Sequence, residues 1–334
     1  MKSSEVVQAW KSILMGRRPS LSIELTRECP LRCPGCYAYD AAHLGTTSNV
    51  TLRQLSDFKD NALVRNVLRV VDEHQPLHVS LVGGDPLVRY RELEAILPEL
   101  DRRGIHVQIV TSAFRPIPAH WANYQRLNVV VSIDGLQPEH DLRRAPATYE
   151  RILKNLAEAR VTIHCTITGQ IADRPGYLEQ FLQFWSQRPE IKKVWMSIFT
   201  PQQGAEGPEI LTPAVRSAVI AELLRLQPLY PILDMHESAL REFLNPPQSP
   251  ADCIFARTTH TVSADLKTVI TPCQFGGNPD CSQCGCVASM GLAAVGHYKV
   301  VGGLTAGHLF KVSEVVGRNV KKIFDQPKKR TVVQ

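Results

Sequence analysis

The feature that most constrains the fold is a regular alternation of short apolar runs with helical patterns over the first two-thirds of the chain. Six apolar runs have the length and composition of strands, at residues 21–26, 77–84, 106–112, 127–135, 161–169 and 193–200. Helical patterns accompany them at residues 52–74, 90–103, 148–160, 175–187 and 212–226, with a shorter one at 116–124. This order predicts a parallel sheet with helices outside it, either doubly wound or curled toward a barrel.

The side-chain pattern within the strands favours the curled form. Ser22, Glu24 and Thr26 share one face of the first strand, and Ser132 and Asp134 share a face of the fourth. A doubly wound sheet is buried on both faces and reads as almost continuously apolar, whereas a polar inner face suits a partly open barrel with a wet lumen. We therefore expect a partial (β/α)6 barrel.

Four regions follow from this reading. They are an N-terminal helix at 1–18, the barrel at 19–227, a small Cys-rich domain at 228–290 and a C-terminal segment at 291–334. Within the Cys-rich domain we expect a β-hairpin formed by residues 260–264 and 268–271. The basic tail, residues 318–330, is expected to be a frayed terminus without a function.

The chain has nine cysteines, and eight of them lie in two tight groups. The N-terminus lacks the apolar stretch and cleavage site of a signal peptide, and no apolar run is long enough to span a bilayer. We therefore expect a cytoplasmic chain with reduced thiols, in which clustered cysteines are metal ligands. The ninth, Cys165, shares the outward face of its strand with isoleucines and is expected to be an inert core thiol. A net charge of +6 is too small to indicate a nucleic-acid partner.

The first group is Cys29, Cys33 and Cys36, spaced Cys-x3-Cys-x2-Cys directly after the first strand. No fourth Cys or His stands nearby to complete a structural zinc site, which needs four protein ligands. Three thiolates on one loop suit a cubane iron–sulfur cluster that leaves one iron open. A zinc knuckle that borrows a distant ligand is the alternative.

This loop resembles the signature of the radical S-adenosylmethionine (SAM) superfamily. The resemblance implies a [4Fe–4S] cluster on the three cysteines, SAM on the open iron, and a 5′-deoxyadenosyl radical that takes hydrogen from a substrate. The family usually has an aromatic residue before the third cysteine, where this chain has Gly35. The neighbouring Tyr37 is therefore expected near the adenine.

Two later segments support the resemblance and imply the SAM contacts. Gly83-Gly84-Asp85-Pro86 resembles the family's Gly-Gly-Glu-Pro segment, with Asp in place of Glu, and Ser132-Ile-Asp134-Gly135 resembles its ribose-binding segment. An arginine of the family pairs with the methionine carboxylate, a role that spacing gives to Arg144 before Arg143. The residues implied to hold SAM are Gly83, Gly84, Asp85, Ser132, Asp134, Arg144 and Tyr37.

The second group is Cys253, Cys273, Cys281, Cys284 and Cys286. Its hairpin and cysteines resemble the SPASM and twitch domains of radical SAM enzymes, which implies one auxiliary [4Fe–4S] cluster. Four ligands suffice, and Cys284 is favoured over Cys286 because Cys281-x2-Cys284 closes easily on one metal. A four-cysteine zinc ribbon is the competing interpretation.

The resulting hypothesis is a radical SAM enzyme, an oxidoreductase or transferase. It would act on a small molecule or metabolite, with His164, Thr166, Thr168 and Ser197 facing the substrate in the lumen. A flavodoxin- or ferredoxin-like electron donor is implied, since the cleavage needs a strongly reducing electron. Three alternatives remain: a maturase of ribosomal peptides, addition of the adenosyl radical to an isoprenoid-like alkene, and a non-enzymatic zinc- or cluster-bearing binding protein.

Overall fold

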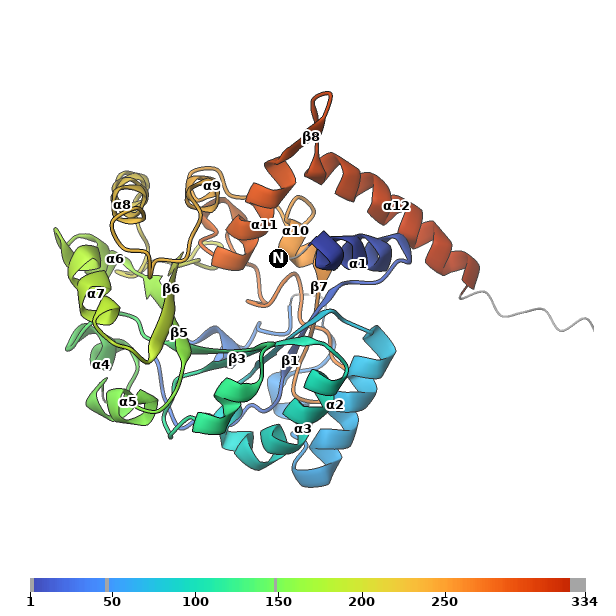
Figure 1. The fold of residues 1–334 in the computed structure, drawn as a ribbon, viewed down its shortest axis with the longest axis horizontal. Coiled ribbons are helices and arrows are strands. Elements are labelled where there is room, and N and C mark those ends of the chain that lie inside the picture. The colour runs from blue at the N-terminus through green and yellow to red at the C-terminus, as the bar shows by residue number, and fades with distance from the viewer. Residues whose placement is uncertain (1–2, 46–47, 147–148, 325–334) are drawn as a thin grey trace, which may run out of the picture.

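The computed structural model describes residues 3–45, 48–146 and 149–324 (Figure 1). A seven-stranded sheet forms the frame, in the order β6-β5-β4-β3-β2-β1-β7, and all its strands are parallel. Its strands are β1 (Ser20–Glu24), β2 (His78–Val82), β3 (His106–Thr111), β4 (Leu127–Ser132), β5 (Val161–Ile167), β6 (Ile191–Ile198) and β7 (Thr259–Val262). The first six coincide with the predicted strands. The sheet curves around the centre of the molecule as the partial barrel of an α/β fold (Figure 1).

The helices that connect the strands lie outside the sheet. The longer ones are α2 (Asp60–His74), α3 (Tyr90–Arg102), α5 (Tyr149–Leu156), α7 (Tyr177–Ser186) and α8 (Pro213–Leu226). The short ones are α4 (Glu139–Arg143), α6 (Gly169–Ala172), α9 (Glu237–Glu242) and α10 (Ile254–Thr258). Single 3-10 turns are η1 (Tyr37–Tyr39), η2 (Leu52–Gln54), η3 (Pro86–Arg89), η4 (Ala119–Asn123) and η5 (Cys281–Gln283).

One predicted helix begins later than its pattern indicates. The pattern starts at residue 52, but α2 begins at Asp60. The Asp57 carboxylate accepts hydrogen bonds from Thr26 Oγ1 at 2.9 Å and from the backbone N–H of Arg27. These bonds hold residues 55–59 as a loop against the end of β1, so the helix starts after them.

The main core lies between the outward face of the sheet and the helices. Trp185 and Phe181 of α7 are its largest fully buried side chains. Cys165 is 1% exposed within this core, and burial raises the pKa of its thiol well above the ordinary value. The prediction of an outward-facing core thiol is confirmed.

The predicted hairpin at 260–271 takes a different form. Its first strand, β7, pairs in parallel with β1 and so extends the barrel sheet by one strand. The return segment makes two ladder bonds, Ser263 N–H to Thr268 O at 2.8 Å and Ile270 N–H to Thr261 O at 2.9 Å. The free edge of β1 supplies more backbone partners than the short return segment, which explains why the strand joins the barrel.

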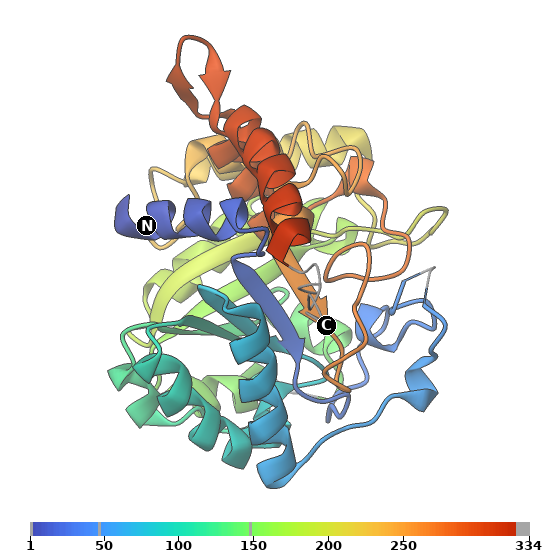
Figure 2. The ribbon, with the colours of Figure 1, turned by 90° about the vertical axis from the view of Figure 1, so that its right-hand side faces the viewer.

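The C-terminal segment lies at the end of the barrel where the N-terminal helix packs. It comprises α11 (Val287–His297), a hairpin of β8 (Lys299–Val301) with β9 (Leu304–Thr305), and α12 (Ala306–Phe324). Helix α12 lies across α1 (Ser3–Leu14) (Figure 2). The prediction of a frayed tail is therefore wrong for residues 318–324, and residues 325–330 lie outside the described part of the chain.

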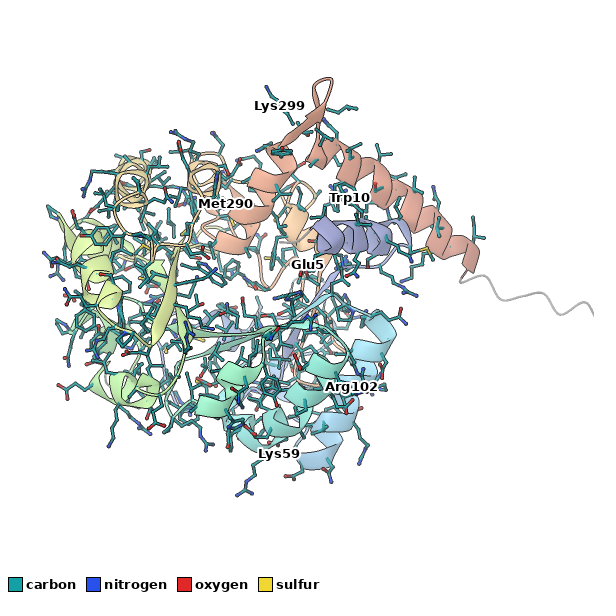
Figure 3. The ribbon with its side chains drawn as sticks, in the orientation of Figure 1. Glu5, Trp10, Lys59, Arg102, Met290 and Lys299 are labelled. Carbon is teal, nitrogen blue, oxygen red and sulfur yellow. The ribbon has the colours of Figure 1, made fainter. Side chains whose placement is uncertain are left out.

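A glycine permits this helix crossing. A Cβ atom at Gly317 would lie 2.0 Å from the carbonyl oxygen of Ile13, so no larger residue fits there. Helix α1 also reaches the start of β3, where Glu5 Oε1 lies 3.0 Å from His106 Nε2. Glu5 and Trp10 of α1 lie above the sheet, and Met290 of α11 is fully buried (Figure 3). No helix among the described residues is long and apolar enough to cross a membrane.

Candidate active site at the barrel mouth

The first cysteine group lies on the loop that leaves β1 at its carboxyl end. Cys29, Cys33 and Cys36 are all free and half-buried. Burial is the main reason that the pKa of Cys29 is raised to about 11 and that of Cys33 is raised as well. In a parallel barrel this end of the strands is where active sites form.

Gly83 and Gly84 are explained by the close approach of this loop. A Cβ atom at Gly83 would lie 2.4 Å from the carbonyl oxygen of Thr26, and one at Gly84 would lie 2.2 Å from that of Glu28. Gly83 also has a φ of +136°, in the region that favours glycine. The N–H of Gly84 donates to Thr26 O at 2.7 Å. The two glycines thus seat the start of the cysteine loop on the end of β2.

Asp85 is turned into the protein and is 1% exposed. Its carboxylate accepts four hydrogen bonds: from Leu87 N–H, Thr111 Oγ1, Ser112 N–H and Ser112 Oγ, at 2.6–3.0 Å. Burial outweighs these bonds and raises its pKa. The structure therefore places Asp85 where it ties the ends of β2 and β3 together.

Asp134 and Arg144 form the charged part of the mouth. Asp134 Oδ2 accepts from Arg144 Nε at 2.8 Å and from Arg143 Nε at 3.0 Å, and Oδ1 accepts from Thr166 N–H. Burial acts to raise the pKa of Asp134, but the two guanidinium groups prevail and hold it well below its ordinary value. The backbone N–H of Arg32, between Cys29 and Cys33, donates to Ala145 O at 2.7 Å, so the cysteine loop lies beside the Asp134–Arg144 pair.

The predicted substrate residues line the inner face of β5 and β6. His164 Nε2 lies 2.8 Å from Ser197 Oγ, and Ser197 Oγ accepts from the N–H of Val287, the first residue of α11. Burial lowers the pKa of His164 to about 4, so its ring is neutral at pH 7. Thr166 lies beside Asp134, and Thr168 is buried at the start of α6. Ser132, at 7% exposed, ends β4 beside them.

All five cysteines of the second group line one pocket, together with Phe275 and Ser289. Cys253 Sγ lies 3.1 Å from Ser289 Oγ. The Arg216 guanidinium donates to the carbonyl oxygens of Gln283 and Cys284 and so fixes the loop that carries the last cysteines. Burial raises the pKa of Cys273 to about 12. Five soft thiol ligands around one pocket fit an iron–sulfur cluster.

The structure does not draw these thiols together as tightly as a single metal ion requires. Among residues 3–45, 48–146 and 149–324, no three His, Cys, Asp or Glu side chains are grouped so that they could hold one ion. Neither cysteine group is thus arranged to hold one ion, and the five cysteines of the second group lie around a pocket.

Two residues that join the cysteine groups were not predicted as site residues. Glu24, on the inner face of β1, lies 2.6 Å from His43 Nε2 and accepts from Ser263 Oγ, and all three side chains are buried. Tyr37 packs on His43 and edge-on against Phe275, with ring centroids 5.6 and 5.5 Å apart. The polar face of β1 signalled Glu24, whereas nothing in the sequence singles out His43, because its partner is 19 residues away.

Comparisons with known proteins agree with this geometry. The family described as the Radical SAM superfamily matches residues 23–176, from β1 to the residue before α7. A search of curated proteins found no match. SuiB of Streptococcus suis, solved with the precursor peptide SuiA, has 15% identity and a TM-score of 0.55 over 78% of this chain and 61% of SuiB. A structure of anSMEcpe with bound AdoMet and the Cp18Cys peptide has 16% identity and a TM-score of 0.55 over 77% of this chain and 74% of that one.

At such identities the likeness to solved structures is one of fold, and this chain spans about 61% of the length of SuiB. The family match is more informative, because it covers the loop with Cys29, Cys33 and Cys36, the two glycines that follow β2 and the Asp134 network. The family uses a [4Fe–4S] cluster and SAM, and the Cys-rich region follows the matched domain. Residues 23–176 of this chain therefore form a radical SAM domain.

Proposed function

We propose that this chain cleaves SAM reductively and uses the resulting radical on a substrate held in the barrel lumen. Cys29, Cys33 and Cys36 would hold the [4Fe–4S] cluster, which would supply the one electron needed for reductive cleavage of the sulfonium C–S bond of SAM. The observation that carries the proposal is the meeting of the cysteine loop with the Asp134–Arg144 pair at the barrel mouth.

Arg144 is proposed to hold the carboxylate of SAM. Its Nε is taken by Asp134, so its orientation is fixed before any cofactor arrives. A guanidinium has further N–H groups in the same plane, and a planar fork suits a carboxylate. Asp134, held as a carboxylate by its two arginines, would keep Arg144 in place as well as contact the ribose.

Asp85 is proposed to act as a positioning residue. Its four protein donors leave little capacity for the methionine amino group. The backbone of Gly83 and Gly84, which already lies against the cysteine loop, is the better placed partner for that group.

The second group is proposed to bind one auxiliary [4Fe–4S] cluster through Cys253, Cys273, Cys281 and Cys284. Cys286 is the spare thiol: it accepts a weak hydrogen bond from Gln274 Nε2 at 3.6 Å, and it also interacts with Tyr37 on the side of the first group. A zinc ion on four of the cysteines is the competing occupant.

The substrate is proposed to lie against His164, Thr166 and Ser197. A neutral His164 beside a hydroxyl can orient a substrate without adding charge to the lumen. A small molecule remains our first candidate, and an electron donor of the flavodoxin or ferredoxin type would supply the electron. Modification of a peptide is the second candidate, favoured by the peptides bound in the SuiB and anSMEcpe structures.

The test is formation of 5′-deoxyadenosine. Protein reconstituted anaerobically with iron and sulfide, then reduced with dithionite, should convert SAM to 5′-deoxyadenosine and methionine. Cys165→Ala is the matched control, because it removes a thiol from the core and should leave cleavage within about twofold. Absence of cleavage by a protein that carries its full iron content would overturn the proposal.

A further inference from the structure

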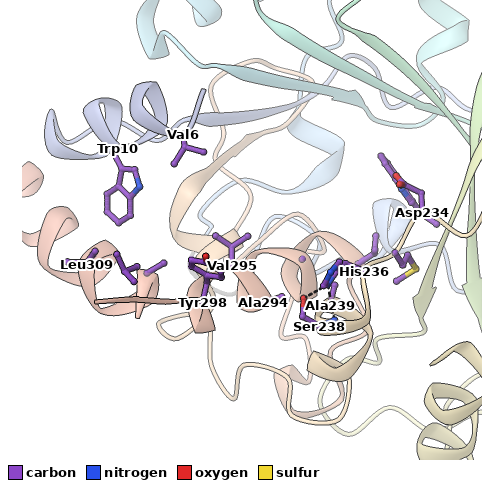
Figure 4. A pocket seen from close by; sticks show the side chains of 16 residues that line it. Val6, Trp10, Asp234, His236, Ser238, Ala239, Ala294, Val295, Tyr298 and Leu309 are labelled. Carbon is purple, nitrogen blue, oxygen red and sulfur yellow. Dashed lines mark hydrogen bonds between the residues drawn. The ribbon is translucent and has the colours of Figure 1, made fainter. Parts of the chain in front are cut away.

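An apolar groove lies outside the site described so far. It has a volume of about 660 Å³ and runs between α1, α9, α11 and the start of α12 (Figure 4). Val6 and Trp10 of α1 face Val295 of α11 and Leu309 of α12 across it (Figure 4). This volume lies in the range of ligand sites, which are mostly apolar with a few polar groups.

Three polar side chains of the groove already have partners in the protein. Asp234 accepts from Lys193 Nζ at 2.6 Å and from Trp195 Nε1 at 3.2 Å. His236 Nδ1 pairs with Ser238 (Figure 4). A ligand would therefore meet aliphatic and aromatic surface, with no free charge to bind an ionic group.

The mouth of the groove exposes apolar surface to water. Val295 is 51% exposed and Tyr298 is 70% exposed, on the same side as the β8–β9 hairpin. Exposed apolar surface beside a groove is typical of a binding site.

Gly291 of α11 gives independent support. It lines the groove, and a Cβ atom built there meets nothing within 4 Å, so no close approach requires glycine. A glycine inside a helix costs about 1 kcal/mol relative to alanine. Alanine at position 291 would stabilise the helix more than glycine does. The effect of Gly291 is to widen the groove.

The inner wall of the groove reaches the barrel lumen. Trp195 and Val287 both line it. Trp195 is two residues from Ser197 on the same face of β6, and the N–H of Val287 donates to Ser197 Oγ. Two wall residues of the groove thus adjoin Ser197, one of the side chains proposed to face the substrate.

We propose that this groove binds an extended hydrocarbon chain of the substrate, with the reacting part of the molecule toward Ser197. This inference rests on the proposed function, because the substrate that the groove would help to bind is the one proposed to react in the lumen beside Ser197. It assigns the substrate to a class: a molecule with an extended apolar chain and not a polar metabolite.

The test is equilibrium dialysis of radiolabelled straight-chain alcohols against the cluster-loaded protein. Butanol, octanol, decanol and dodecanol form the series, with farnesol as the isoprenoid arm. Each added CH₂ should tighten binding roughly fourfold until the groove is filled. An affinity that does not depend on chain length overturns the inference.

Gly291→Leu should weaken dodecanol binding at least tenfold, because its side chain enters the groove, and Gly291→Ala is the matched control, expected within threefold. Ala239→Leu fills the groove from α9 and gives a second blocked variant. Unchanged dodecanol binding by both blocked variants overturns the inference. So does tight binding of a Leu/Ala octapeptide without binding of dodecanol, since that result makes the groove a peptide site.

SAM cleavage, measured on the same preparations, separates the two proposals. Cleavage without chain-length-dependent binding refutes the groove alone. Chain-length-dependent binding by a fully loaded protein that does not cleave SAM refutes the proposed function alone.

Discussion

The two cysteine groups differ in how the protein surrounds them. Cys29, Cys33 and Cys36 lie on one loop at the open mouth of the barrel, beside charged side chains. The five cysteines of the second group come from three places in the chain, Cys253, Cys273 and the segment Cys281–Cys286, and line one pocket. A site of three ligands beside a lumen leaves room for a cofactor to react, whereas a site with ligands to spare can satisfy a metal cluster completely.

The surroundings explain how the two groups can work together. Tyr37 follows the third cysteine of the first group, and its ring contacts Phe275, which lines the pocket of the second. Glu24 contacts His43, and His43 contacts the backbone oxygen of Phe275, so these two residues hold the same junction. The open group is thus anchored on the enclosed one, so the position of the reacting site depends on the integrity of both.

The largest predicted effect that separates the two cysteine groups is a change in iron content. Alanine at Cys253, Cys273, Cys281 or Cys284 should each reduce iron from about eight to about four per chain, since a four-iron cluster loses a ligand. Cys286→Ala should keep about eight, as the matched control in the same loop. Loss of iron in Cys286→Ala with retention in Cys284→Ala would exchange the two roles. Bound zinc in the parent protein would contradict the auxiliary cluster.

A smaller effect is expected at the charged side of the open group. Asp134→Asn removes the charge that faces Arg143 and Arg144, and breaking a buried pair of this kind costs about 3 kcal/mol of unfolding free energy. Urea unfolding measures it. Glu237→Gln, which breaks the exposed pair with Arg241, should change stability by less than about 0.5 kcal/mol. Equal effects of the two variants would mean that the Asp134 network is not an anchor of the mouth.

The smallest effect is a pH dependence beneath that network. His140 Nδ1 accepts from the N–H of Asp134, and burial, helped by Arg144, lowers the pKa of His140 to about 4. The unfolded state then binds more protons than the folded state between pH 6.5 and 4, so stability falls as the pH falls through this window.

The variant His140→Asn keeps an acceptor for Asp134 and removes this titration. Between pH 7 and pH 5, the unfolding free energy of this variant should fall by about 1–2 kcal/mol less than that of the parent. The slope should not vanish, because burial also lowers the pKa of His78, His164 and His260 to about 4. The exposed His308→Asn should keep the parent slope, and a parent-like slope in His140→Asn would contradict this account of the site.

Local patterns predicted most of the barrel and failed where distant segments meet. The period-two alternation of β1, β4 and β5 gave the polar lumen and the core position of Cys165, because one strand's pattern is a local property. The pairing of β7 with β1 was missed because it joins residues more than 200 positions apart. The fold of the tail was missed since α12 is held by its contact with α1, through Gly317 and Ile13.

The same division holds for the site. The order of the cysteine, Gly-Gly and Ser-x-Asp-Gly segments along the strands predicted that they meet at one end of the barrel, and the structure places them there. Sequence could not show that the Asp85 carboxylate turns inward, because its donors come from the end of β3. Nor could it show the groove at Gly291, which is formed by helices from both ends of the chain.

The central claim is that Cys29, Cys33 and Cys36 hold a four-iron cluster that cleaves SAM. It is tested most directly by counting iron and 5′-deoxyadenosine in the triple alanine variant at these positions, reconstituted beside the parent. The account predicts about eight irons in the parent, about four in the variant, and no detectable 5′-deoxyadenosine from the variant. A variant that keeps eight irons, or that still cleaves SAM, would contradict it.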